Sequence, residues 1–435
     1  MVKAKDVTKK KWTLMVYLAG DNNLDAAGTA DVMEMKQVGS NDDINIVVQF
    51  DRAGAKRKTN RYFLRKGTTM AKDVVQVLGE TNTGDPKVLK DFIGWGITNY
   101  PAERYLLVLW NHGAGWDDSN LYTGDYFGGA TPPVVRKRTT IAEGTKRGAL
   151  KPVQASTVRA GAHRARRALF ATTFIKQATT RAICFDDQAK DFLDNMEMKR
   201  VLTDVKKQLK RKIDVLGFDA CLMSMVEVAY QVKGAVSVTC GSEEEEPNEG
   251  WPYDRVLKAL AAKPTMSPQE LGATVTREYL ASYKANEGVT FAATDLAAID
   301  PLAKAIDGLG KELSTALSDA SLRTTVSACR SQVQEYTSPY DDYVDLVDLC
   351  DVLSHNLNRS EVTSACDAVK AAAAKAVIAH GAKGTSVANS NGISIYFPKK
   401  QVCSLYANLD FVKKNAWTGF VKNYVAGLGN RSWVN

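Results

Sequence analysis

GFDACLMS, residues 217–224, follows an apolar run over 213–218 and leads into a helical pattern over 222–232. This order predicts a buried strand that turns into a helix, with Cys221 at the turn. WNHG, residues 110–113, ends a second apolar run over 105–110 and places His112 just beyond it. Sites in open α/β sheets form outside the carboxyl ends of strands, so we expect Cys221 and His112 to face each other there.

The rest of the first half alternates between apolar runs and helical spacing. Alternation of this kind predicts an α/β fold with a mostly parallel sheet covered on both faces. Beyond about residue 256 the pattern is mostly helical, with a helix predicted over 360–380 and strands over 289–296 and 392–397. We therefore divide the chain into an α/β region, 1–255, interrupted by an insert at 131–182, and a mixed helix and strand region, 256–435.

The composition favours a globular protein. The chain is 45% hydrophobic and 24% charged, and no apolar run approaches the roughly 20 residues of a membrane helix. Lysines precede the apolar segment 12–20, but that segment is short and strand-like, so we expect no signal peptide and favour the cytoplasm over secretion. The seven cysteines are scattered and form no CxxC pair, which argues against disulfides and structural zinc and fits a reducing compartment.

The positive charge is concentrated in the insert. Residues 131–182 hold twelve Lys or Arg and one acid, a net charge of +11, so the remainder carries −3 of the chain's +8. The insert has no convincing periodicity, which predicts a long exposed loop. Such a loop can hold nucleic acid or an acidic surface electrostatically. Only Phe170 and Phe174 are available for base stacking, which argues against nucleic acid.

Cys221 and His112 suit thiol chemistry. Partial positive charge at the start of a helix over 222–232 would favour the Cys221 thiolate. His112 would serve as a general base or acid, and the N–H groups of Gly113 and Cys221 would form an oxyanion hole. Taken alone, however, these two residues favour a buried structural cysteine and an unrelated histidine over a catalytic pair.

Six ordered stretches resemble the clostripain family of cysteine peptidases, whose clan includes caspases, gingipains and legumain. They are WTLMVYLAGDNNL, GDPKVLKDFIGWGITNYPAERYLLVLWNHGAGW, AICFDD, LGFDACLMSMVEVAY, GSEEEEPNEGWPYD and GISIYFP. The resemblance covers nearly the whole chain except 131–182. It implies a caspase-like α/β/α sandwich and a cysteine endopeptidase, with His112 and Cys221 as a catalytic dyad that cleaves after Arg or Lys.

The resemblance also assigns residues around the dyad. Asp219 is placed at the base of the pocket for the basic side chain, which agrees with bidentate pairing of a carboxylate with a guanidinium. A helix-capping Asp is the alternative. Ser242 and Trp251 are implied beside the substrate backbone. The run 243–246 and Glu249 either add negative potential near the pocket or form a solvated loop.

Maturation and cofactors follow from the same resemblance. Relatives are often cut after a basic residue between the histidine and cysteine motifs, so the insert is a candidate activation loop, with Arg136, Lys137, Arg138 and Arg181 as candidate cleavage sites. No cofactor is required, although some relatives depend on calcium; the candidate carboxylates are Asp117, Asp118, Asp186, Asp187, Asp341 and Asp342. We expect protein or peptide substrates with Arg or Lys, no membrane partner, and a monomer or processed two-chain form. The alternatives are an inactive caspase-like scaffold and a binding protein that uses the basic loop.

Overall fold

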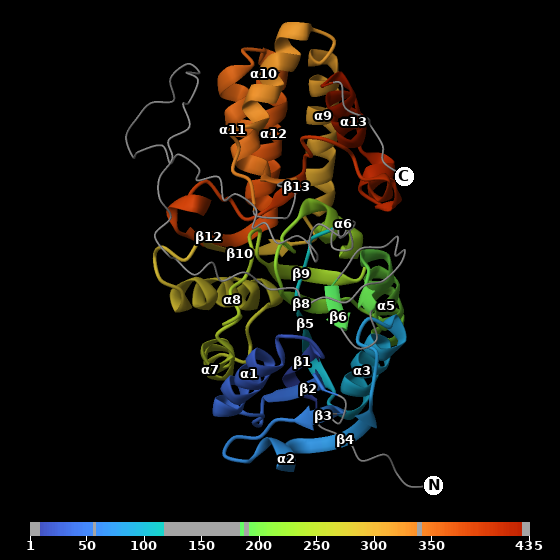
Figure 1. Ribbon diagram of the computed structural model, residues 1–435. Helices are drawn as coiled ribbons and strands as arrows, with labels where there is room; N and C mark the ends of the chain where they lie inside the picture. The colour runs from blue at the N-terminus through green and yellow to red at the C-terminus, as the bar shows by residue number, and fades with distance from the viewer. Residues whose placement is uncertain (1–8, 55–57, 117–182, 187–190, 337–341, 429–435) are drawn as a thin grey trace, which may run out of the picture.

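A nine-stranded sheet forms the centre of the molecule in a computed structural model that describes residues 9–54, 58–116, 183–186, 191–336 and 342–428 (Figure 1). The strand order is β12-β10-β9-β8-β5-β1-β2-β3-β4. The bounds are β1 (Lys10–Gly20), β2 (Ile44–Arg52), β3 (Thr59–Phe63), β4 (Val74–Gly79), β5 (Ala102–Trp110), β8 (Ile213–Asp219), β9 (Val236–Gly241), β10 (Val289–Asp295) and β12 (Val377–Lys383).

The middle of the sheet is parallel and its two edges are antiparallel. Strands β2, β1, β5, β8 and β9 pair in parallel, whereas β3, β4, β10 and β12 pair antiparallel with their neighbours. The predicted α/β class with a mostly parallel sheet is therefore confirmed.

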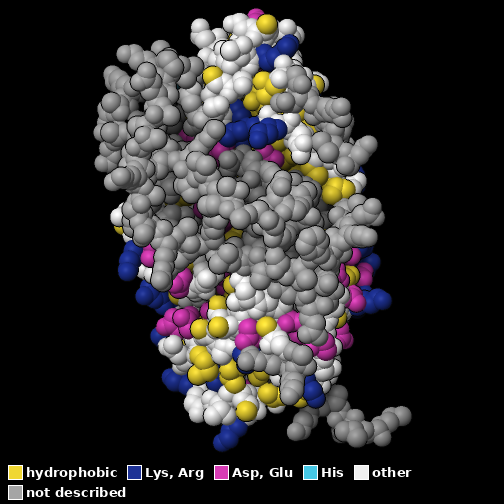
Figure 2. Space-filling model, in the orientation of Figure 1, with side chains coloured by type: hydrophobic (Ala, Val, Ile, Leu, Met, Phe, Trp, Pro, Cys, Tyr) yellow, Lys and Arg dark blue, Asp and Glu magenta, His cyan; other side chains and the backbone are white. Residues whose placement is uncertain are grey.

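Apolar side chains gather at the lower end of the face in Figure 2. This end of the molecule holds edge strand β4, in which Val75 and Val77 are half exposed.

Side chains of the central strands alternate between two hydrophobic cores, one on each face of the sheet. In β1, Leu14 and Val16 belong to one core, and Met15 and Tyr17 belong to the other. This alternation is the period of two that a strand imposes, and both faces need cover because both are apolar. Helices α1 (Asp25–Val38), α7 (Tyr253–Ala262) and α8 (Pro268–Ser282) cover the first face; α3 (Pro86–Asn99), α5 (Asn195–Leu209) and α6 (Val226–Val232) cover the second.

The later part of the chain adds two strands to this sheet and a helical layer at one end of it (Figure 1). The helices are α9 (Ile299–Ala316), α10 (Ala320–Arg330), α11 (Leu346–Asn356), α12 (Ser360–Ala376) and α13 (Trp417–Gly427). The sheet continues across residue 256 through β10 and β12, while the division of the chain into two regions at that residue stays a prediction.

One predicted helix is too long. The alanine-rich pattern over 360–380 predicts a single helix, but α12 ends at Ala376 and the chain continues as β12. Pairing of β12 with β10 at the edge of the sheet satisfies this backbone, and long-range pairing of that kind leaves no local signal.

The remaining elements are short. They are α2 (Met70–Asp73), the pair β6 (Ile183–Asp186) and β7 (Asp191–Leu193), and the pair β11 (Tyr343–Asp345) and β13 (Ser394–Tyr396). Within the described ranges, no helix has the length and apolar character needed to cross a membrane.

The packing of Trp251 against Gly217 of β8 gives a test of the fold. A Cβ added to Gly217 would lie 2.4 Å from Cη2 of the buried Trp251 ring. Since overpacking costs about 1–3 kcal/mol, we expect Gly217→Ala to lower the free energy of unfolding by that amount in urea titrations. Gly234→Ala is the matched control, because nothing lies within 4 Å of its added Cβ. Coincident unfolding curves for the two variants would contradict this packing.

Candidate active site

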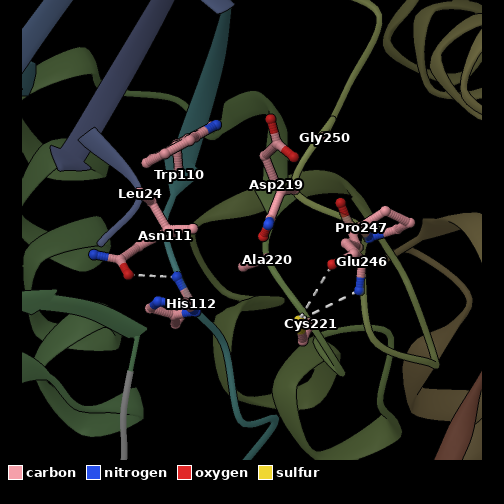
Figure 3. Close-up of a pocket in the computed structure, with 11 residues that line it drawn as sticks. Leu24, Trp110, Asn111, His112, Asp219, Ala220, Cys221, Glu246, Pro247 and Gly250 are labelled. Carbon is pink, nitrogen blue, oxygen red and sulfur yellow. Dashed lines mark hydrogen bonds between the residues drawn. The ribbon is translucent and has the colours of Figure 1, made fainter. Parts of the chain in front are cut away.

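The pairing of β5 with β8 brings His112 and Cys221 to the same edge of the sheet. Trp110 pairs with Asp219 in parallel register, and the Asn111 N–H donates to the Asp219 carbonyl oxygen at 3.2 Å. His112 and Cys221 each lie two residues beyond that last pair. Both line one pocket, drawn in Figure 3. Its other lining residues are Leu24, Trp110, Asn111, Asp219, Ala220, Glu246, Pro247, Asn248 and Gly250.

Gly113 packs directly against the backbone of Cys221. A Cβ added to Gly113 would lie 2.5 Å from the Cys221 carbonyl oxygen and 3.1 Å from its nitrogen. Only a residue without a side chain allows the two strand extensions to approach this closely. The backbone of Gly113 is therefore adjacent to that of Cys221, as an oxyanion hole made by these two residues requires.

His112 is held in place by asparagine side chains. Its backbone N–H donates to Oδ1 of Asn111, and its Nε2 lies 2.8 Å from Oδ1 of Asn23. Asn111 in turn donates from Nδ2 to the carbonyl oxygen of Ala19, the penultimate residue of β1, at 2.6 Å. Burial lowers the pKa of His112 from 6.5 to about 4, so the imidazole is neutral near pH 7.

Cys221 lies against the segment 242–246. The Glu246 N–H donates to Sγ of Cys221 at 3.3 Å (Figure 3). The Leu222 N–H donates to the Glu244 carbonyl oxygen at 3.3 Å. Burial raises the pKa of the Cys221 thiol well above its ordinary value, and the acidic charge of Glu245 adds to the effect. The thiol is therefore protonated at neutral pH in this arrangement.

The expected helix start at Leu222 is wrong. Helix α6 begins at Val226, because Leu222 has a left-handed backbone with φ 64° and Met225 is extended. Cys221 consequently does not lie at a helix N-terminus, and no helix dipole lowers its pKa. The capping alternative for Asp219 also fails, since the residue that precedes α6 is Met225, which makes no side-chain cap.

Asp219 lies at the end of β8 and points toward Gly250, away from Cys221 (Figure 3). The hydroxyl of Tyr253 donates to Oδ2 of Asp219 at 2.8 Å, and the Trp251 N–H lies 3.4 Å from the same oxygen. Burial raises the pKa of Asp219 from 3.8 to about 6, so the carboxylate is mostly ionised at pH 7. Asp219 is thus a buried negative charge in the pocket that contains the thiol.

Two further acids surround Asp219. Glu246 belongs to the acidic run 243–246, and it is buried and lines the pocket rather than lying in a solvated loop. Asp31 was not singled out from the sequence. Burial, together with the charge of Asp219, raises the pKa of both Glu246 and Asp31 well above the ordinary values. Asp31 accepts a hydrogen bond from the Trp110 indole at 2.6 Å, and the buried Glu246 carboxyl group is hydrogen-bonded with that of Asp219. In the part of the chain that the structure describes, no Lys or Arg forms an ion pair with Asp219 or Glu246.

The remaining predicted residues lie elsewhere. Ser242 is buried, and its hydroxyl contacts the Glu244 carbonyl oxygen at 2.8 Å and Thr290 of β10 at 3.0 Å. The Trp251 ring is buried beneath β8. Neither side chain lines the pocket, and their substrate-binding roles stay predictions.

The predicted cleavage and calcium residues fall mainly outside the described ranges. Arg136, Lys137, Arg138, Arg181, Asp117, Asp118, Asp187 and Asp341 lie outside them, as does the side chain of Asp186. Among the residues that the structure describes, no three His, Cys, Asp or Glu side chains converge on a possible metal position.

Comparison with known proteins identifies the family. The clostripain family model matches residues 16–125 and 172–424, a span that includes both His112 and Cys221. The chain belongs to the clostripain family. As a member of this family, the protein is a cysteine endopeptidase. The clostripain of Hathewaya histolytica is 23% identical over 498 residues, covering 98% of this chain and 83% of that protein.

Solved structures share the fold of this clostripain-family chain. A secreted C11 cysteine protease from Bacteroides thetaiotaomicron, in complex with an irreversible peptide inhibitor, has a TM-score of 0.60 at 20% identity and covers 95% of this chain and 99% of its own. An inactive zymogen C11 protease from Parabacteroides distasonis has a TM-score of 0.59 at 19% identity, with coverage of 93% and 98%. At these identities the likeness concerns the fold.

The raised pKa of Cys221 predicts slow alkylation at neutral pH. Because only the thiolate reacts, the rate at which iodoacetamide alkylates Cys221 should keep rising as the pH increases through 9. Mass spectrometry of peptides from the quenched protein would measure the rate at each cysteine, with the half-buried Cys403 as internal comparison. A rate for Cys221 that reaches its plateau below pH 8 would contradict a buried, protonated thiol.

Proposed function

We propose that this cysteine endopeptidase cleaves peptide bonds after Arg or Lys, with Cys221 as nucleophile, His112 as general acid and base, and Asp219 as the partner of the basic side chain. The observation that carries the proposal is the shared pocket. A thiol and a neutral imidazole lie at adjacent strand ends, beside buried carboxylates that have no cationic partner among the described residues.

The reaction begins with a neutral pair. Sγ of Cys221 attacks the carbonyl carbon of the peptide bond, and the thiol proton passes to His112. This attack forms the S–C bond and turns the carbonyl oxygen into an oxyanion. The N–H groups of Gly113 and Cys221 stabilise that oxyanion. The C–N bond then breaks, and His112 gives its proton to the leaving amine. Water, activated by His112, hydrolyses the thioester and restores the thiol.

The acids of the pocket support selection for a positive side chain. A guanidinium forms paired hydrogen bonds with a carboxylate, whereas a lysine ammonium binds as a compact charge. Asp219 is held by Tyr253 and Trp251, so its position is set before substrate binds. Glu246 lies in the same pocket and would ionise as a cation enters, because an opposite charge lowers a carboxyl pKa.

Hydrolysis of fluorogenic peptides tests the specificity. We expect Asp219→Asn to reduce kcat/KM for Arg and Lys peptides by about 30-fold or more, because losing one partner of a buried charge pair costs about 2 kcal/mol or more. Asp254→Asn is the matched control, since Asp254 lies on α7 and does not line the pocket. Cys221→Ala should abolish hydrolysis.

Two results of this assay would contradict the proposal. An Asp219→Asn enzyme with unchanged selectivity for basic peptides would remove Asp219 as the specificity residue. A wild-type protein that cleaves no Arg or Lys peptide would favour an inactive scaffold or a binding role of the basic insert.

The same assay with EDTA, followed by added calcium, tests whether the enzyme depends on calcium. A calcium-dependent enzyme would lose activity in EDTA and regain it when calcium is added.

Self-processing in the insert is part of the proposal. Residues 131–182 supply many Lys and Arg sites between the histidine and cysteine motifs, which is the residue type that the pocket selects. On denaturing gels, we expect wild-type protein to convert to two fragments while Cys221→Ala stays intact. Terminal sequencing would compare Arg136, Lys137, Arg138 and Arg181 as cut sites. Identical band patterns for the two proteins would exclude self-processing.

A further inference from the structure

The segment that follows β1 contributes to the site, although the reaction proposed above uses none of its residues. Strand β1 pairs in parallel with β5, and its Leu18 lies opposite Trp110. The residues just beyond β1, Asp21-Asn22-Asn23, therefore lie beside the extension of β5 that carries His112. This segment and the Cys221 extension lie beyond β1 and β8, the two strands that flank β5.

Asn22 fixes the position of this segment. Its Nδ2 donates to the carbonyl oxygen of Ala19 at 3.0 Å and lies 3.4 Å from Oδ1 of Asn111, while its Oδ1 accepts the Leu24 N–H at 2.8 Å. Ala19 also accepts from Asn111. The two strand extensions are thus joined by side-chain amides, which have no charge to titrate.

Asn23 is the residue of this segment that reaches the imidazole. Its Oδ1 lies 2.8 Å from Nε2 of His112. An amide oxygen only accepts hydrogen bonds, so Nε2 of His112 must carry the hydrogen. Because the ring is neutral, its other nitrogen, Nδ1, then holds the free electron pair.

We propose that Asn23 is a positioning residue that holds His112 as the Nε2–H tautomer, so that Nδ1 is the atom that exchanges protons with Cys221 and the leaving amine. The proposal rests on the proposed roles of His112 and Cys221 but not on the Arg or Lys specificity. The same hydrogen bond fixes the rotation of the ring, and its amide oxygen accepts equally well from the imidazolium that forms during the reaction.

The surroundings of Asn23 make it a clean site for substitution. The Asn23 side chain is exposed, so its truncation removes no core packing. The titratable groups that line the same pocket as His112 are Cys221, Asp219 and Glu246, and an Asn23→Ala change adds no charge near any of them. Asn60→Ala is the matched control, because it removes an asparagine whose Nδ2 contacts Tyr62 at 3.3 Å on β3, away from the pocket.

NMR of full-length protein with ¹⁵N-labelled histidine reads the tautomer directly. In wild-type protein near pH 7 we expect the His112 signals of a protonated Nε2 and an unprotonated Nδ1, assigned by their loss in His112→Ala. Asn23→Ala should move these signals toward a mixture of the two tautomers, and Asn60→Ala should leave them unchanged. A wild-type His112 protonated on Nδ1, or signals unaffected by Asn23→Ala, would overturn the proposal.

Kinetics supply the second measurement. Asn23→Ala should lower kcat about 10- to 100-fold with little change in KM. This loss is part of the rate enhancement that general acid–base catalysis contributes. Asn23→Asp retains the acceptor and should restore most of kcat at neutral pH, but its charge raises the pKa of His112. The acidic limb of kcat should therefore move to higher pH by about one unit; kcat is the parameter to follow, because the bound basic side chain keeps Asp219 ionised.

The possible outcomes separate the two proposals. Wild-type kcat in Asn23→Ala, or an acidic limb that does not move in Asn23→Asp, would overturn the positioning role. If wild-type protein cleaves peptides without preference for Arg or Lys while the His112 signals respond to Asn23→Ala, the specificity proposal fails and the positioning role stands. Thermal unfolding of each variant confirms that it is folded.

Discussion

The parallel pairing of β5 with β8 sets the positions of His112, Asp219 and Cys221. Because Trp110 lies opposite Asp219, the two strands end together, and each chain continues for two residues before it reaches His112 or Cys221. A shift of one residue would turn every β5 side chain to the other face of the sheet, and the alternation between two apolar cores opposes such a shift. Gly113 then allows the extensions to touch. The two apolar cores thus fix the strand register, and the register places His112 and Cys221 together at the edge of the sheet.

The pocket combines a neutral pair with a cluster of buried carboxyl groups. Burial lowers the pKa of His112 and raises that of Cys221, so neither is charged before substrate arrives. The same burial makes Asp219 and Glu246 costly to ionise together, and a substrate cation would offset that cost. In the proposed mechanism, Asp219 binds the basic side chain of the substrate, and His112 activates the thiol of Cys221. Asp219 and Cys221 are separated in the sequence by Ala220 alone.

Much of the fold was predictable because it depends on apolar periodicity. The strands expected from the apolar runs 105–110, 213–218 and 289–296 follow directly from local pattern. The start of α6 was not predictable from local pattern. Leu222 adopts its left-handed backbone where the chain hydrogen-bonds with the segment 242–246. Asp219 and the two reactive residues stood out by motif and by their place at strand ends. Asn23 did not stand out, because its contact with His112 joins segments far apart in the sequence. For Glu246 the sequence left open a charge near the pocket or a solvated loop, because burial of this segment depends on tertiary packing.

Covalent labelling tests the central claim most directly. A peptide with a thiol-reactive electrophile at its carboxyl end and Arg or Lys in the cleaved position should modify Cys221 stoichiometrically, as mapped by mass spectrometry of the full chain. The rate of labelling should fall strongly in His112→Ala, and by about 30-fold or more in Asp219→Asn, although both variants retain the thiol. Modification at another cysteine, or equal labelling by a peptide with a neutral residue in that position, would contradict the account.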